Sequence, residues 1–166
     1  MTLEFEKRHK EEAHDSVAIV DETKKTILIY SPDLNFCFSL SMLFQDRYNV
    51  ITTTNSSMLQ TFVAHYAANL VIVDASPTEK MIDVLHRVKE LNRQLPIIML
   101  YVYSPKEASL DKAVRSEVDS VFYKPFDLSA MSKRINELLP MMDANVAKGI
   151  YKSFVAADAA SGRAKR

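Results

Sequence analysis

The chain has 166 residues, of which 48% are hydrophobic and 25% are charged, the composition of an ordinary globular protein. Its 21 basic and 21 acidic side chains cancel, which argues against a nucleic-acid binder that works through bulk positive charge. The two glycines, Gly149 and Gly162, lie near the end, so residues 1–148 hold neither a P-loop nor a glycine-rich dinucleotide motif. The single cysteine, Cys37, excludes an intrachain disulfide and any multi-cysteine metal site.

Composition divides the chain into three regions. Residues 1–24 are a charged N-terminal extension, residues 25–140 have the apolar periodicity of a folded domain, and residues 141–166 are a basic C-terminal extension that we expect to be partly flexible. The longest apolar run, residues 97–103, is far shorter than the roughly 20 residues of a membrane-spanning helix. The first 25 residues lack the apolar segment of a signal peptide. We therefore expect a cytoplasmic protein with no membrane partner.

Runs rich in β-branched residues alternate with segments of helical period. The predicted strands are residues 26–30, 49–54, 70–74, 96–103 and 120–123, and the predicted helices are residues 33–48, 56–68, 78–92, 106–118 and 127–142. We expect Leu34 on the buried face of the first helix and Leu91 on that of the third. Pro140 lies inside the last pattern, where it would kink or end the helix. Five alternating pairs predict an α/β fold, in which helices cover both faces of a parallel sheet.

An acid and a base follow two of these strands directly. In an open parallel sheet the functional crevice lies beyond the carboxyl ends of the strands. Asp74 ends the apolar run at residues 70–73, and Lys124 ends the strand at residues 120–123. Two interpretations are open. The two side chains form a salt bridge that ties two loops together, or the carboxylate is chemically modified and the ammonium holds the added charge.

Residues 25–139 resemble the receiver domain of two-component response regulators, of the chemotaxis type. Three segments in the family's order carry the resemblance: residues 69–74, residues 96–100, and residues 119–126 with their Lys-Pro pair. The resemblance implies a flavodoxin-like (βα)5 three-layer sandwich with a five-stranded parallel sheet in the order 2-1-3-4-5. It also implies that Asp74 stands at the phospho-acceptor position and that Lys124 contacts the phosphoryl group.

The expected acceptor pocket departs from the family pattern. Where the family has two acids that hold Mg²⁺, this chain has Ser31 and Pro32, which are poor ligands for a cation that prefers anionic oxygens. Asp33 follows and could reach the metal, but we favour it as the N-cap of the next helix. If Mg²⁺ binds at all, Asp33 and Asp74 are its carboxylate ligands. Tyr101 replaces a threonine or serine, and we expect its bulk to crowd the pocket.

A second register for the first strand must be weighed. Residues 17–22 also look like a strand that ends in two acids, Asp21 and Glu22, which would restore the metal site. The stretch from Ser31 to Asp74 accommodates a helix, a strand and a helix. Starting from Asp21 instead would leave residues 26–30 as an extra strand without a place in the sheet. We therefore prefer the register that ends at Ser31.

These residues support a stand-alone receiver-like signalling module that is not an enzyme and has lost ordinary Mg²⁺-dependent aspartyl phosphorylation. In this hypothesis Asp74 pairs with Lys124, and the Tyr101 hydroxyl caps the same carboxylate. The alternative is a phosphorylatable response regulator that receives phosphate on Asp74 in a phosphorelay. An enzyme that binds a flavin or nucleotide on the same scaffold is a third candidate, but the lack of glycine before residue 149 makes phosphate binding difficult.

The resemblance also implies a signalling face on the fourth helix, fifth strand and fifth helix. The residues expected there are Val121, which replaces the family's aromatic switch, and Tyr101, Tyr103, Tyr123 and Arg115. Aromatic side chains ringed by charge suit a protein interface. We expect a protein partner, such as a histidine kinase or a regulator, or a homodimer on this face, and no nucleic acid. The alternative is that the tyrosines only pack under the fourth helix. We expect His86 to lie on the opposite side.

Overall fold

The computed structural model describes residues 20–140. The C-terminal extension and nearly all of the N-terminal extension therefore lie outside the described residues. Of the alternative first strand at residues 17–22, only Val20–Glu22 are described, and these three residues are not in a strand. The sheet begins at Thr26 instead, so Ser31 follows its first strand.

Five parallel strands form one sheet in the order β2-β1-β3-β4-β5, which confirms the expected flavodoxin-like topology. The strands are β1 (Thr26–Tyr30), β2 (Asn49–Thr53), β3 (Leu70–Asp74), β4 (Ile97–Tyr101) and β5 (Ser120–Tyr123). The strand order reverses between β1 and β3. In open parallel sheets, such a reversal opens the crevice in which ligands and reactive groups lie. Ser31 and Asp74 are at that point.

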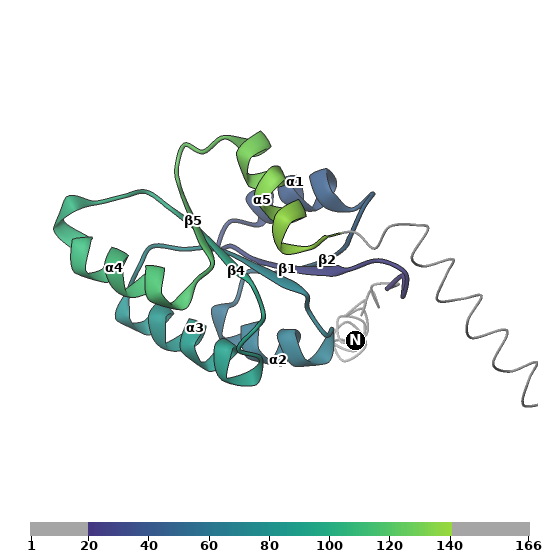
Figure 1. Cartoon of the computed structure of the whole chain (residues 1–166), viewed down its shortest axis with the longest axis horizontal. Helices are drawn as coiled ribbons and strands as arrows, with labels where there is room; N and C mark the ends of the chain where they lie inside the picture. Colours follow the sequence, from purple (N-terminus) through teal and green to yellow (C-terminus); the bar gives the residue numbers. More distant parts are fainter. Residues whose placement is uncertain (1–19, 141–166) are drawn as a thin grey trace, which may run out of the picture.

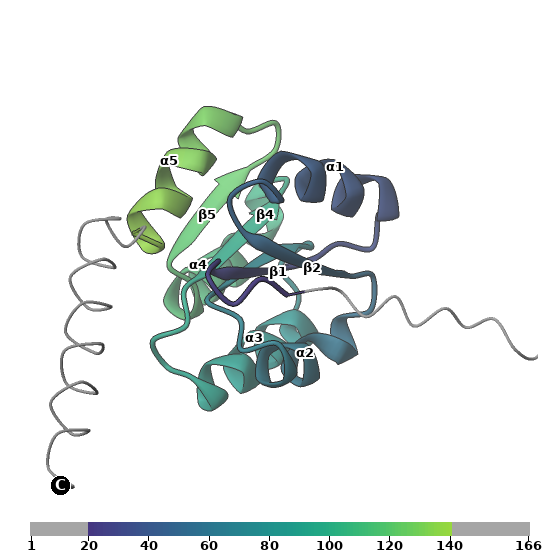
Figure 2. The same cartoon turned by 90° about the vertical axis from the view of Figure 1, so that its right-hand side faces the viewer.

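Helices cover both faces of the sheet and make three layers (Figures 1 and 2). One face carries α1 and α5, and the other carries α2, α3 and α4. The helices are α1 (Leu34–Phe44), α2 (Leu59–His65), α3 (Glu79–Leu91), α4 (Ala108–Glu117) and α5 (Leu128–Leu138), with short 3₁₀ turns η1 (Ser56–Met58) and η2 (Pro105–Glu107). Within residues 20–140, no helix combines the length and apolarity needed to cross a membrane.

The sheet divides the hydrophobic core in two, and strand alternation decides which half each residue joins. Successive side chains on a strand point to opposite faces. In β3, Ile72 packs toward α1 and α5, whereas Val73 packs toward α2, α3 and α4. In β4, Leu100 and Tyr101 are divided in the same way. This alternation also sets the direction of the functional side chains at the strand ends.

Two expected core residues are exposed. Leu34 is 69% exposed and Leu91 is 52% exposed. At 100° per residue, Leu34 lies about 60° from Cys37 and farther still from the rest of the buried face of α1. Leu91 likewise lies about 60° from Val88, the nearest buried residue of α3. Helix α5 ends at Leu138, two residues before Pro140, because the residue before a proline is disfavoured in a helix.

Candidate functional site

Ser31, Asp74 and Lys124 come together at the carboxyl edge of the sheet. The hydroxyl of Ser31 donates a hydrogen bond to Oδ2 of Asp74 at 2.8 Å. The ammonium of Lys124 lies 2.5 Å from Oδ1 of the same carboxylate. Asp74 is only 8% exposed, so both of its oxygens are engaged in a poorly solvated place. Each of the three side chains follows a residue that faces the α2–α4 side, and alternation therefore turns all three toward α1 and α5.

Neighbouring groups hold these three side chains in place. The hydroxyl oxygen of Ser31 also accepts a hydrogen bond from the backbone N–H of Asp33 at 3.0 Å. The ring of Phe36, from α1, lies 4.7 Å from the ammonium of Lys124, in cation–π geometry. The backbone N–H of Lys124 donates to the carbonyl of Tyr101, and the peptide bond from Lys124 to Pro125 is cis. The ammonium thus lies between a carboxylate and an aromatic face.

Asp33 and Pro32 do not join the carboxylate of Asp74. Asp33 is the N-cap of α1, and its Oδ1 accepts hydrogen bonds from the backbone N–H groups of Asn35 and Phe36. Pro32 is exposed and its side chain offers no ligand atom. Among residues 20–140, no three His, Cys, Asp or Glu side chains gather in a way that could hold a metal ion.

The expected position of Tyr101 is wrong. Its hydroxyl donates to Oδ1 of Asp111 on α4 at 2.7 Å, and its side chain is buried in the α2–α4 half of the core. The cause is strand alternation: Asp74 pairs with Leu100 in the β3–β4 ladder, and Tyr101 is one residue later. Tyr101 therefore points to the opposite face of the sheet, where it neither crowds the Asp74 pocket nor caps the carboxylate.

Asp111 joins two strands to α4 through a tyrosine–aspartate cluster, which consists of Tyr101, Tyr123, Asp111 and Arg115. The hydroxyl of Tyr123 donates to Oδ1 of Asp111 at 2.6 Å, and Arg115 pairs with Oδ2 at 3.2 Å. Arg115 also donates to the Tyr123 hydroxyl and lies over its ring. The two tyrosine rings meet edge to face, 5.5 Å apart. Four side chains from three elements thus fix the position of α4.

The cluster shifts the pKa values of its members. Burial, followed by the hydrogen bond to Asp111, raises the pKa of Tyr101 well above its usual range. Burial alone would raise the pKa of Asp111, but the hydrogen bonds from Tyr123, Tyr101 and Arg115 outweigh it and lower that pKa. The carboxylate of Asp111 is therefore stabilised in its charged form.

Only part of the expected signalling face reaches the surface. Tyr101 is buried, Tyr123 is half-buried, and Val121 packs against the α2–α4 core. Tyr103 is 44% exposed and its ring rests on that of Tyr123 at 5.2 Å. The side chain of Arg115 is half exposed. For Tyr101 and Tyr123 the structure thus favours packing beneath α4, and it leaves Tyr103 and Arg115 accessible.

Sequence reasoning missed two residues of these sites. Asp111 lies four residues before Arg115 in the predicted fourth helix, a spacing that favours an ion pair on one helix face. That spacing was the available clue to its role. Phe36 had no comparable signal, because its contact with Lys124 depends on how α1 lies over the sheet.

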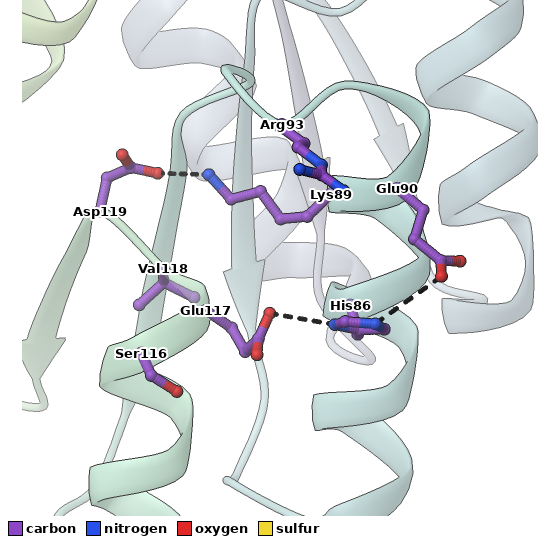
Figure 3. Close-up of a pocket in the computed structure, with 8 residues that line it drawn as sticks. All are labelled: His86, Lys89, Glu90, Arg93, Ser116, Glu117, Val118 and Asp119. Atoms are coloured by element: carbon purple, nitrogen blue, oxygen red, sulfur yellow. Dashed lines mark hydrogen bonds and ion pairs between the residues drawn. The ribbon is translucent and has the colours of Figure 1, made fainter.

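A charged pocket of about 420 Å³ opens between α3 and α4, at the other end of the sheet (Figure 3). In this pocket Lys89 forms an ion pair with Asp119, the residue just before β5. Lys124 of the Asp74 site follows the other end of β5, so the pocket and the Asp74 site lie at opposite edges of the sheet. The imidazole of His86 lies 3.5 Å from Glu117 on α4 and 3.7 Å from a carboxylate oxygen of Glu90. His86 therefore contacts the fourth helix and does not lie on the side opposite to it. Lys89 and Asp119 thus form an ion pair in the pocket, and both Glu90 and Glu117 contact the imidazole of His86.

Comparison with solved structures identifies the fold. A two-component response regulator from Clostridium difficile superposes with a TM-score of 0.61 and 16% identity, over 73% of this chain and 100% of that one. The chemotaxis protein CheY4 of Vibrio cholerae gives a TM-score of 0.58 and 21% identity, over 70% of this chain and 99% of that one. A protein from Burkholderia pseudomallei, named as related to pilus assembly, superposes with a TM-score of 0.58 and 20% identity, over 72% of this chain and 92% of that one.

The fold is therefore that of response-regulator receiver domains, as the sequence resemblance implied. Identities this low establish the fold alone. The chain matches no protein-family model, and no curated protein matches it. The function must therefore be argued from the residues of the site.

Proposed function

We propose that this protein is a receiver-like signalling module that works through protein contacts and has lost ordinary Mg²⁺-dependent aspartyl phosphorylation. The fold that it shares with response regulators supports a role in signalling. The arrangement around Asp74 carries the rest of the proposal, since both carboxylate oxygens are already bound by Ser31 and Lys124. In this proposed function, these side chains have no catalytic role.

The donor atoms around Asp74 do not fit Mg²⁺, which prefers an octahedron rich in anionic oxygens. Among the residues that the structure describes, Asp74 supplies the single carboxylate of the pocket, and one of its oxygens is shared with an ammonium. Ser31 offers a neutral hydroxyl that is already used as a donor and an acceptor. The nearest further acid, Asp33, caps α1. Without a divalent cation, a second negative charge at Asp74 would have to be neutralised by Lys124 alone.

The tyrosine–aspartate cluster supports a module that keeps one conformation. A receiver that switches needs two arrangements of its signalling face that differ little in free energy. Here the hydroxyl of Tyr101, at the end of β4, is bound to Asp111 of α4 and not to Asp74. The side chain of Tyr101 therefore does not connect the Asp74 pocket to the signalling face. The partner face would then be constitutive, and its accessible residues are Tyr103 and Arg115. A protein partner or a second copy on that face follows from the proposal.

Incubation with acetyl phosphate and Mg²⁺, followed by intact mass measurement, tests the proposal. We expect no mass gain of about 80 Da, the mass of one phosphoryl group. The double substitution Ser31→Asp and Pro32→Asp restores two acids at the end of β1 and serves as the positive control. A gain in the wild type that disappears in Asp74→Asn would overturn the proposal and establish the phosphorelay alternative.

A further inference from the structure

Strand β2 is an edge of the sheet, and within residues 20–140 no other strand pairs with its outer side. The backbone N–H of Asn49 and the carbonyl of Thr53 both form hydrogen bonds with residues that flank β1. Because the hydrogen-bonding direction of the backbone alternates along a strand, Val50 and Thr52 turn their N–H and C=O groups outward. Two residues with free backbone donors and acceptors therefore line this edge.

The sequence of β2 does nothing to prevent further pairing. Natural edge strands are usually protected by charged side chains, by proline or by a covering element. Strand β2 has the sequence Asn-Val-Ile-Thr-Thr, without a charge or a proline. At the opposite edge, Arg134 of α5 donates hydrogen bonds to the hydroxyl of Ser120 in β5 and to the carbonyl of Asp119. A charged side chain thus covers the start of β5, and none belongs to β2.

Helix α1 lies above the gap between β1 and β2 (Figure 2). The thiol of Cys37 lies 3.6 Å from the carbonyl oxygen of Ser31, after β1, and 3.9 Å from that of Thr53, at the end of β2. Neighbouring strands are about 4.8 Å apart. If two copies were joined along β2, their α1 helices would be separated by about two strand spacings, or about 9.6 Å. That separation is within the range of about 8–10 Å between packed helices.

The flank of α1 that faces this edge is apolar and exposed. Leu43 borders a hollow that α1 shares with α5, so it marks the α5 side of the helix. At 100° per residue, Leu34 lies about 180° and Phe38 about 140° around the helix from Leu43. Leu34 is 69% exposed, Phe38 is 65% exposed and Met42, which continues the row, is 53% exposed. Such a row of large apolar side chains is typical of a contact surface.

We propose that two copies of this chain associate through β2, antiparallel about a two-fold axis at Ile51, and form one continuous ten-stranded sheet. Val50 of each copy then exchanges both backbone hydrogen bonds with Thr52 of the other copy, which makes four hydrogen bonds in all. The axis is perpendicular to the sheet, so both α1 helices lie on the same face and their apolar flanks meet. The interface is isologous, the commonest kind in homo-oligomers.

A second copy covers both exposed features at once, and this favours it over other occupants. An extended peptide paired with β2 would leave the flank of α1 exposed, because the occupant must also carry a helix at the height of α1. Neither β2 nor α1 contains a charged residue, so identical surfaces meet without repulsion between like charges. Tyr103 packs beside β5, at the other edge of the sheet, so the proposed signalling face stays free in the pair.

The size of this interface predicts a weak dimer. Leu34, Phe38 and Met42 together expose on the order of 300 Å² of apolar surface in each copy. Even with the strand contact added, the buried area is at the small end of specific interfaces. We therefore expect a dissociation constant in the micromolar range.

Sedimentation velocity of the full-length chain, without Mg²⁺ or a phosphate donor, tests the pairing. From about 1 to 500 µM we expect a reversible monomer–dimer equilibrium. Thr52→Pro removes two of the four intermolecular hydrogen bonds and keeps those to β1, because the Thr52 N–H points outward. Phe38→Asp brings two like charges together at the contact. Each variant should weaken the dimer at least about tenfold. Leu91→Asp, at a site on α3 that is also more than half exposed, is the control and should not.

Amide exchange measured by NMR adds a test at single residues. The amides of Val50 and Thr52 should exchange at least about tenfold more slowly at a concentration that favours the dimer than at one that favours the monomer. The amide of Ile51 faces β1 and should be protected at both concentrations.

Three results would overturn the proposal. The wild type stays monomeric at every concentration, or Thr52→Pro and Phe38→Asp both dimerise as the wild type does while β1 and β3 stay protected. In the third, the amides of Val50 and Thr52 are protected equally at all concentrations, which would assign the edge to another segment of the same chain. Each outcome is independent of whether Asp74 accepts phosphate.

Discussion

Lys124→Met is expected to destabilise the fold by about 1–3 kcal/mol. The substitution removes the ammonium 2.5 Å from Asp74 and leaves a carboxylate that is 8% exposed with the Ser31 hydroxyl as its remaining side-chain partner. Removal of one partner from a fully buried pair costs about 3–5 kcal/mol. The side chain of Lys124 is 31% exposed, so water screens the pair and lowers that figure. Methionine keeps much of the apolar stem that packs beside Phe36.

Urea unfolding followed by circular dichroism measures this loss. Lys133→Met, an exposed lysine on α5, is the control and should change the free energy of unfolding by less than about 0.5 kcal/mol. Adding Asp74→Asn to Lys124→Met should recover part of the loss, because the uncompensated charge is removed. If Lys124→Met costs no more than the control, or if the double variant is no more stable than the single one, Asp74 is not held as we describe.

Three further predictions concern α4 and its surface. Asp111→Ala leaves the hydroxyls of Tyr101 and Tyr123 without their acceptor. Hydrogen-exchange measurements should then show amide exchange in α4 at least about tenfold faster than in the wild type. An unchanged rate would contradict the role of Asp111 in anchoring α4. Because the folded-state pKa of Asp111 lies below its ordinary value of 3.8, the stability that it contributes is complete above that value and is lost as pH falls through the folded pKa. Between about pH 5 and 2.5, urea midpoints should therefore fall more steeply in the wild type than in Asp111→Asn, and equal slopes would refute this. Tyr103→Ala and Arg115→Ala should each weaken self-association in sedimentation or partner capture in pull-downs by about tenfold, whereas wild-type behaviour of both would place the partner elsewhere.

The strands could be predicted because their local composition is decisive. The apolar runs at Leu70–Asp74 and Ile97–Tyr101 are covered on both faces, and such strands are continuously hydrophobic. The position of Asp74 and Lys124 at one edge followed from the rule that parallel strands end together. Their 2.5 Å contact is a consequence of that arrangement.

Tyr101 could have been placed correctly from the same pattern, and Leu34 could not. Alternation along β4 puts Met99 and Tyr101 on one face and Leu100 on the other, so the direction of Tyr101 was available from the sequence. For α1 the helical period is uninformative, because apolar residues occur on all of its sides. The exposure of Leu34 depends on which side α5 and the sheet cover, and that is a tertiary property.

Titration with Mg²⁺, followed through the ¹⁵N amide shifts of Ser31, Asp74 and Lys124, tests the central claim most directly. We expect no saturable shift in the wild type up to tens of millimolar Mg²⁺, because Asp74 is paired with Lys124 and Ser31 and, within residues 20–140, no second free carboxylate faces it. The variant with Ser31→Asp and Pro32→Asp should show a saturable shift at the same amides. A saturable shift of the wild-type amides that disappears in Asp74→Asn would contradict the account.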